Sequence, residues 1–215
     1  MSTIPTQTLM TDMADPLGMR DVRLVVVGDA FAAGVGDPKA LGWVGRVVAR
    51  SQSPELSLTA YNLGIRDDSS ADVLSRWREE SGRRFAPGAE HRLVLNMGYG
   101  DVAQGLSTAR SRLNLANVLD DAAAFSVPTL VVGPAPTLDP AFDERLLVVA
   151  DAQADVCARR NVTFVDCFEP LLKHEQWASD LATGDGVHPG QAGYGLIAWL
   201  VLHQGWPDWL GITLG

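Results

Sequence analysis

The sequence predicts a three-layer α/β/α sandwich, in which helices cover both faces of a five-stranded parallel sheet. Apolar runs alternate with helical periodicities five times along the chain, which is the pattern of parallel strands joined by helices. The first run, Leu24 to Val27, is rich in β-branched residues and ends at Gly28 and Asp29, as a buried strand entering a loop would. In such a sheet, the loops at the carboxyl ends of the strands carry the chemistry.

Each strand is predicted from an apolar run that is bounded by glycine, proline or a polar turn. The expected strands are 22–27, 56–63, 91–97, 127–132 and 162–165. Helices are expected where apolar residues recur every three or four positions. The expected helices are 41–50, 71–85, 113–125, 142–160 and 191–203, with a short helical piece over 171–181 and a loop over 99–108.

One domain, residues 22–215, is expected to follow a flexible N-terminal tail, residues 1–21. The tail is polar and aperiodic, and no repeat or shift in composition marks a second boundary. The apolar C-terminal stretch around Trp206 and Leu210 is expected to pack on the body of the domain rather than form a dimer contact. Trp177 is likewise expected in the core rather than in a pocket wall.

Composition excludes several classes of protein. Of 215 residues, 47% are apolar, which is enough to bury a substantial core, and the net charge of −9 argues against nucleic acid and anionic membrane surfaces as partners. No apolar run is long enough to cross a membrane, and the N-terminus lacks the pattern of a secretory signal. Two cysteines, Cys157 and Cys167, are too few for a disulfide framework and are expected to be small buried residues. These features predict a cytoplasmic protein.

The glycines after the first strand do not form a nucleotide-binding motif. They fall at positions 28, 34 and 36, which matches neither the dinucleotide fingerprint nor a P-loop with its lysine. Gly28 could therefore do no more than permit a tight turn from strand to loop.

Four short blocks follow strand ends or precede the last helix. They are Gly28-Asp29-Ala30, Asn62-Leu63-Gly64, Gly98-Tyr99-Gly100-Asp101 and Asp185-Gly186-Val187-His188. A parallel sheet brings the first three to one edge. The fourth has a spacing that lets the carboxylate hold one imidazole nitrogen protonated and leave the other as a base, although a surface histidine in a turn would show the same spacing.

In their order, these blocks resemble those of the SGNH (GDSL-type) hydrolase superfamily, whose blocks read Gly-Asp-Ser, Asn-x-Gly, Gly-x-Asn-Asp and Asp-x-x-His. The resemblance spans about residues 22–200, and the runs around 34–46 and 62–66 are similar to an esterase/lipase-like branch. It implies the flavodoxin-like SGNH-hydrolase fold with strand order 2-1-3-4-5. It also implies hydrolysis of a small-molecule ester or acyl compound without a cofactor.

Carried over residue by residue, the resemblance implies a catalytic pair and an oxyanion hole. His188 would be the general base, oriented by Asp185. The backbone N–H groups of residues 30 and 64 would hold the oxyanion, together with an asparagine side chain at position 100. Asp29, Asn62 and Asp101 would support the loops by hydrogen bonding. A metal is not expected, because His91, His174 and His203 fall outside the blocks.

Two positions depart from this pattern. Position 30 holds alanine instead of the nucleophilic serine, and position 100 holds glycine instead of the oxyanion asparagine. Three hypotheses follow. The chain could be a binding or regulatory module that has lost hydrolysis, a repurposed enzyme that uses His188 and Asp185 for acid–base chemistry, or an ordinary esterase with an inactivating change at position 30.

Overall fold

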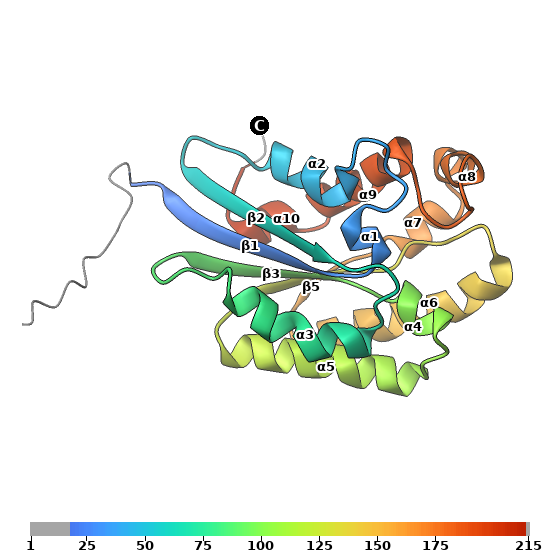
Figure 1. The fold of residues 1–215 in the computed structure, drawn as a ribbon, viewed down its shortest axis with the longest axis horizontal. Helices are drawn as coiled ribbons and strands as arrows, with labels where there is room; N and C mark the ends of the chain where they lie inside the picture. The colour runs from blue at the N-terminus through green and yellow to red at the C-terminus, as the bar shows by residue number, and fades with distance from the viewer. Residues whose placement is uncertain (1–17, 214–215) are drawn as a thin grey trace, which may run out of the picture.

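The computed structural model describes residues 18–213 and confirms the α/β/α sandwich (Figure 1). All strand pairs are parallel, and the sheet order is β2-β1-β3-β4-β5, as predicted. The strands are β1 (Arg20–Gly28), β2 (Leu56–Gly64), β3 (Glu90–Asn96), β4 (Thr129–Val132) and β5 (Thr163–Val165).

Helices cover both faces of the sheet (Figure 1). One face carries α2 (Gly42–Arg50), α9 (Gln191–His203) and α10 (Trp206–Leu210). The other carries α3 (Ser70–Gly82), α5 (Thr108–Ala124) and α6 (Pro140–Ala158). Two further helices, α7 (Phe168–Leu172) and α8 (Glu175–Ala182), replace the single helical piece predicted over 171–181.

Two short helices at the carboxyl edge of the sheet were not predicted. They are α1 (Ala30–Ala33) and α4 (Tyr99–Ala103), the second of which lies in the stretch expected to be a loop. A helix of four or five residues is too short to show a hydrophobic period, so the sequence pattern does not reveal it. Both helices begin within predicted site blocks, at Ala30 and at Tyr99.

Strand β1 begins at Arg20, two residues before its predicted start. Arg20 and Asp21 pair in register with Leu56 and Ser57 of β2. The Arg20 guanidinium also donates to Glu90 at 2.7 Å and to the carbonyl of Gly211 at 2.8 Å, so it ties the strand to the C-terminal segment. Residues 20–21 of the predicted tail therefore belong to the sheet, and residues 1–17 lie outside the described part.

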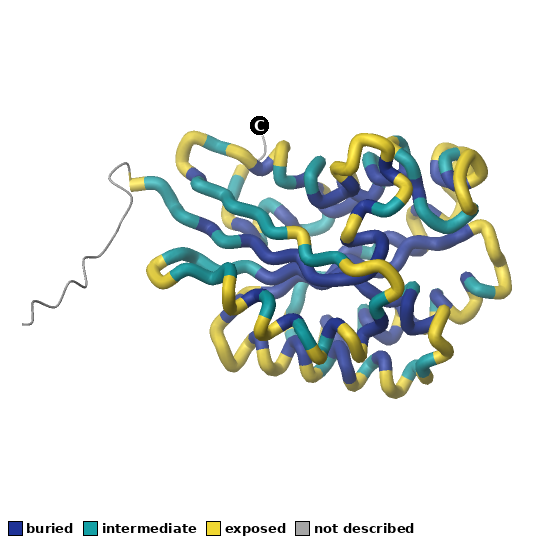
Figure 2. Tube along the Cα trace, viewed as in Figure 1, coloured by how far each residue is buried: buried dark blue, intermediate teal, exposed yellow. Residues whose placement is uncertain are grey.

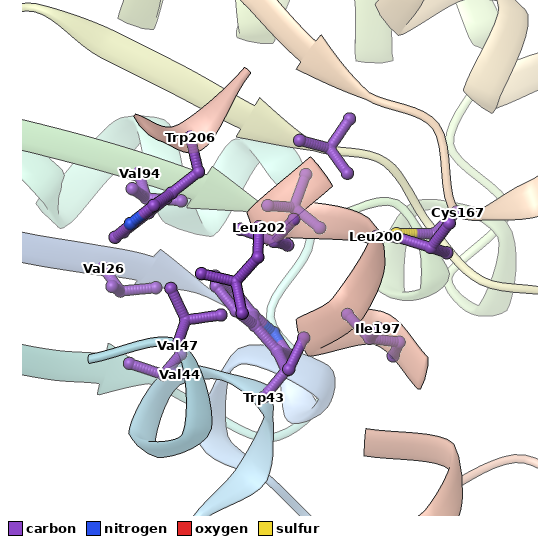
Figure 3. Close-up of a cluster of buried hydrophobic side chains, with 14 of the residues drawn as sticks. Val26, Trp43, Val44, Val47, Val94, Cys167, Ile197, Leu200, Leu202 and Trp206 are labelled. Atoms are coloured by element: carbon purple, nitrogen blue, oxygen red, sulfur yellow. The ribbon is translucent and has the colours of Figure 1, made fainter. Parts of the chain in front are cut away.

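The core lies on both sides of the central strands (Figure 2). Val25 and Val26 of β1 point to opposite faces, and both are fully buried. Figure 3 shows the cluster on the α2–α9 face, where Trp43 and Trp206 pack around Leu202. Trp206 is buried against the body of the domain, as the sequence predicted for the C-terminal stretch.

The other residues that were expected in the core are also buried. The Trp177 indole is 2% exposed and donates to the carbonyl of Pro136 at 3.0 Å. Cys157 and Cys167 are free and buried, and burial raises the pKa of the Cys157 thiol to about 12. Both thiols are therefore protonated, unreactive and part of the packing. Among the described helices, none has the length and apolarity that a bilayer crossing requires.

One buried hydrogen bond joins α2 to the end of β3. The indole N–H of Trp43, which has no exposed surface, donates to the side-chain oxygen of Asn96 at 3.0 Å. Asn96 in turn donates to the carbonyl of Val132 at 3.1 Å. The ends of β3 and β4 are therefore tied to helix α2 through one buried side chain.

We expect Trp43→Phe to destabilise the protein by about 2–3 kcal/mol, because it leaves the buried oxygen of Asn96 without a donor and opens a void. The matched control is Trp199→Phe, since the Trp199 side chain is 53% exposed, and we expect it to change stability by less than about 0.5 kcal/mol. Urea denaturation of both variants measures this. Equal effects of the two substitutions would contradict the role given to the Trp43 bond.

Candidate functional site

The first site block sits where three strands meet. Gly28 ends β1 and is in register with Gly64 of β2 and Asn96 of β3. A Cβ at Gly28 would lie 1.9 Å from the carbonyl oxygen of Asn96, so no side chain fits there. The structure thus requires glycine at position 28 for packing, independently of any chemistry.

Asp29 and Ala30 begin helix α1. The carboxylate of Asp29 caps the helix by accepting the N–H of Phe31 at 3.0 Å, and Ala30 is the first helical residue, only 2% exposed. Burial raises the pKa of Asp29 to about 7, and the nearby charge of Asp101 acts in the same direction. A methyl group at position 30 offers no oxygen for nucleophilic attack.

Asn62 ties the end of β2 to helix α1. Its amide donates to the carbonyl of Ala32 at 2.6 Å, and its side-chain oxygen accepts the N–H of Gly64 at 3.0 Å. A Cβ at Gly64 would lie 2.2 Å from the backbone nitrogen of Ala33, so glycine is again needed for close packing. The N–H that was expected to serve an oxyanion hole already has an acceptor inside the protein.

The histidine and aspartate of the last block form a pair. The Nδ1 of His188 lies 2.7 Å from the Oδ2 of Asp185. The other oxygen of Asp185 accepts the backbone N–H groups of Val187 and His188 at 2.9 and 2.7 Å. Burial raises the pKa of Asp185, but the hydrogen bonds from His188 and Val187 outweigh it and hold that pKa at about 2. The ionised carboxylate thus fixes the orientation of the imidazole ring through Nδ1. The second ring nitrogen, Nε2, takes no part in this bond.

Aromatic rings surround this imidazole. The ring of Phe31 lies 5.8 Å from that of His188, and the ring of Tyr99 lies 6.1 Å from it. Tyr99 also packs against Phe142 of α6 at 4.8 Å. Sequence spacing gave no signal for this cluster, because its members come from four separate segments.

Asp101 links three helices through hydrogen bonds. It is fully buried, accepts the N–H of Ser70 at 2.6 Å and accepts the hydroxyl of Ser111. It therefore joins α4 to the start of α3 and to α5. This is the loop-fixing arrangement expected for it.

Position 100 is closed by main chain. A Cβ at Gly100 would lie 2.0 Å from the carbonyl oxygen of Asp68, in the turn between β2 and α3. Arg76 of α3 holds that turn, because its guanidinium contacts the Asp68 carboxylate at 2.6 Å and the carbonyl of Gly28 at 3.1 Å. The Asp68–Arg76 contact was not predicted, since the two residues carry no motif and meet only in the folded chain.

A groove of about 570 Å³ opens beside the imidazole. We call it the His188 groove. Its walls include Val35, Gly36 and Pro38 on one side and the 183–192 segment on the other, with Arg66 also lining it. Within residues 18–213, no group of three histidine, cysteine or acidic side chains is arranged to hold a metal ion.

Comparisons with known proteins agree with this architecture. The sequence model of the GDSL-like lipase/acylhydrolase family matches residues 26–196. Esterase TesA of Pseudomonas aeruginosa is 27% identical over 171 residues, which cover 79% of this chain and 80% of TesA.

Two solved structures share the fold. A member of the lipolytic G-D-S-L family from Veillonella parvula superposes with a TM-score of 0.71 at 20% identity, over 84% of this chain and 96% of that one. A mutant of Axe2, an acetyl-xylooligosaccharide esterase from Geobacillus, superposes with a TM-score of 0.73 at 20% identity, over 90% and 97% of the two chains.

The raised pKa of Asp29 predicts a pH-dependent effect of Asp29→Asn. Between about pH 4 and pH 7, the unfolded chain ionises Asp29 while the folded chain does not, so the wild type loses stability as pH rises. Asparagine cannot ionise and can still accept the Phe31 N–H. The variant should gain stability relative to wild type across this window, by up to about 4 kcal/mol above pH 7. Chemical denaturation from pH 4 to pH 8.5 measures the difference, and a difference independent of pH would contradict the prediction.

The contact at position 100 predicts opposite effects for two Gly→Ala substitutions in helices. Gly195→Ala in α9 places its methyl group in open space and should stabilise the protein by about 0.5–1 kcal/mol. Gly100→Ala should destabilise it by roughly 1–3 kcal/mol or more, because the methyl group overlaps the Asp68 carbonyl. Thermal denaturation of the two variants measures both signs. Stabilisation by Gly100→Ala would show that position 100 is open.

Proposed function

Since the chain belongs to the GDSL-like lipase/acylhydrolase family, we propose that it is a non-hydrolytic member of that family. In this proposal, the cleft beside His188 and Asp185 binds a small ester or acyl-type ligand. Ester hydrolysis through a serine nucleophile is absent. The names of TesA and Axe2, both esterases, support this class of ligand.

The observation that carries the proposal is the closed position at Gly100. The asparagine expected there would need a side chain where the carbonyl of Asp68 lies, 2.0 Å from the Cβ site. Arg76 anchors that carbonyl through the Asp68 carboxylate. The loss of the oxyanion donor is therefore part of the packing of α3 and α4, and a single substitution would not reverse it.

The alanine at position 30 has the larger chemical effect. Without the hydroxyl, no acyl-enzyme can form at this position, and loss of the nucleophile from a serine triad lowers kcat by about 10⁶. Loss of one oxyanion donor lowers kcat by about 10²–10³, although such losses are not additive. The two departures act on the same step, which favours a site that is no longer used for it.

The intact His188–Asp185 pair supports a second candidate function. Its geometry, 2.7 Å between Nδ1 and Oδ2 with two backbone N–H groups on the carboxylate, is suited to general acid–base catalysis. Such an enzyme would activate water or remove a proton from its substrate at Nε2. A third candidate, an esterase inactivated only at position 30, accounts for Ala30 but leaves the closed position 100 unexplained.

We expect the unaltered chain to show no turnover of p-nitrophenyl butyrate above that of its His188→Ala variant. Ala30→Ser restores the nucleophile but not the missing oxyanion donor. Its kcat should stay at least about 10²-fold below that of TesA from Pseudomonas aeruginosa, assayed alongside as the positive control.

Each contrary outcome selects another candidate. Turnover by the unaltered chain that disappears in His188→Ala would favour acid–base chemistry. A rate for Ala30→Ser equal to that of TesA would mean that position 30 alone separates this chain from an active esterase.

A further inference from the structure

Arg66 is a charged residue of the His188 groove that has no counter-ion among the described residues. It follows the end of β2 and its side chain is exposed. Across residues 18–213, no carboxylate lies within ion-pair distance of its guanidinium, although the neighbouring Asp68 pairs with Arg76. A guanidinium offers five N–H donors in a planar fork, and no partner among the described residues directs these donors.

The two carboxylates that line the same groove already have donors. The Oδ2 of Asp180 accepts the N–H groups of Gly190 and Gly193 at 2.6 and 2.9 Å. Asp185 accepts two backbone N–H groups and pairs with His188. Among the side chains that line the groove, Arg66, the His188 imidazole and the Gln191 amide therefore keep hydrogen-bonding capacity, and Arg66 is the one cation among the described lining residues.

Another part of the groove wall is apolar and is held by contacts with neighbouring segments. Val35 and Pro38 line it, and the carbonyl of Val35 accepts the Tyr194 hydroxyl at 2.7 Å. A Cβ at Gly36 would lie 2.7 Å from the carbonyl oxygen of Pro189, so the loop packs directly on the segment that carries His188. The groove thus combines an apolar wall with one guanidinium that has no ion-pair partner among the described residues.

We propose that the His188 groove binds a small carboxylate, with the carboxylate on Arg66, the hydrocarbon part along Val35 and Pro38, and the ligand beside the His188 imidazole. This rests on the proposed function, since it assigns a ligand class to the same cleft. The planar fork of Arg66 matches a carboxylate in a bidentate arrangement. A dianionic phosphate is disfavoured, because Asp180 and Asp185 also line the groove and would repel the additional charge.

The test uses hexanoate and its neutral isostere hexanamide as probes on the full chain. Titrations followed by the NMR signals of the His188 imidazole and the 183–192 backbone give both dissociation constants. Only the charged probe can make a charge-assisted hydrogen bond as an ionised acceptor, so we expect hexanoate to bind about 10–100-fold more tightly than hexanamide. Arg66→Gln should abolish this difference by weakening hexanoate alone.

The matched control is Arg50→Gln. Arg50 lies in the last turn of α2, outside the groove, and the substitution changes the net charge by the same amount. It should leave both dissociation constants unchanged. Equal binding of the two probes, undetectable hexanoate binding, or unchanged hexanoate affinity in Arg66→Gln would overturn the inference.

These outcomes are separate from those that test the proposed function. Ester turnover by the unaltered chain would overturn the non-hydrolytic assignment. The Arg66-dependent difference between hexanoate and hexanamide binding would remain. Conversely, a chain that is inert toward esters but does not discriminate hexanoate from hexanamide would retain the proposed function and lose the carboxylate site.

Discussion

Close contact between main chains, at positions that hold no side chain, organises the carboxyl edge of the sheet. Three glycines make these contacts: Gly28 against Asn96, Gly64 against Ala33 and Gly100 against Asp68, with Cβ sites 1.9, 2.2 and 2.0 Å from backbone atoms. Each contact joins two segments that are distant in sequence. Because backbone cannot yield as a flexible side chain can, these contacts leave the segments at this edge little freedom to pack differently.

The same constraint explains why the departures from the family pattern differ in kind. Ala30 differs from serine by one oxygen and leaves the backbone of α1 and its cap on Asp29 intact. Gly100 differs from asparagine by a whole side chain, and the turn at Asp68 fills the vacated volume. The first change removes a reacting atom, whereas the second has become part of the packing between α3 and α4. In the proposed function, Ala30 accounts for the larger part of the lost rate, and the closed position 100 is the part that a single substitution would not reverse.

The His188–Asp185 pair is independent of that packing. It forms within one turn, three residues apart, and its hydrogen bonds are satisfied by the backbone of the same turn. A local motif of this kind can persist after the rest of a catalytic site has changed. It also places the imidazole between an aromatic cluster and the groove that contains Arg66.

Whether a feature could be predicted from the sequence depended on how far apart in the chain its interacting residues lie. The parallel sheet and the buried tryptophan and cysteine residues were predictable, because strand–helix alternation and apolar runs are visible in short windows. The strand order was predictable only through the family resemblance. The helices α1 and α4 were not, because four or five residues show no period. The positions of Asp185 and His188 were predictable from local spacing, whereas the partners of Asn62, Asp101 and Asp68 were not.

The sequence by itself determined the fold, the family and the absence of a serine hydroxyl at position 30, since each is read from residue identity or local order. Only the tertiary structure decided that position 100 is closed, that the N–H of Gly64 is already bonded to Asn62 and that Arg66 lines the groove beside His188 with no counter-ion in the part of the chain that the structure describes. The physical reason is that these properties depend on atoms brought together from separate segments, and a volume or an unpaired charge exists only once those segments have packed.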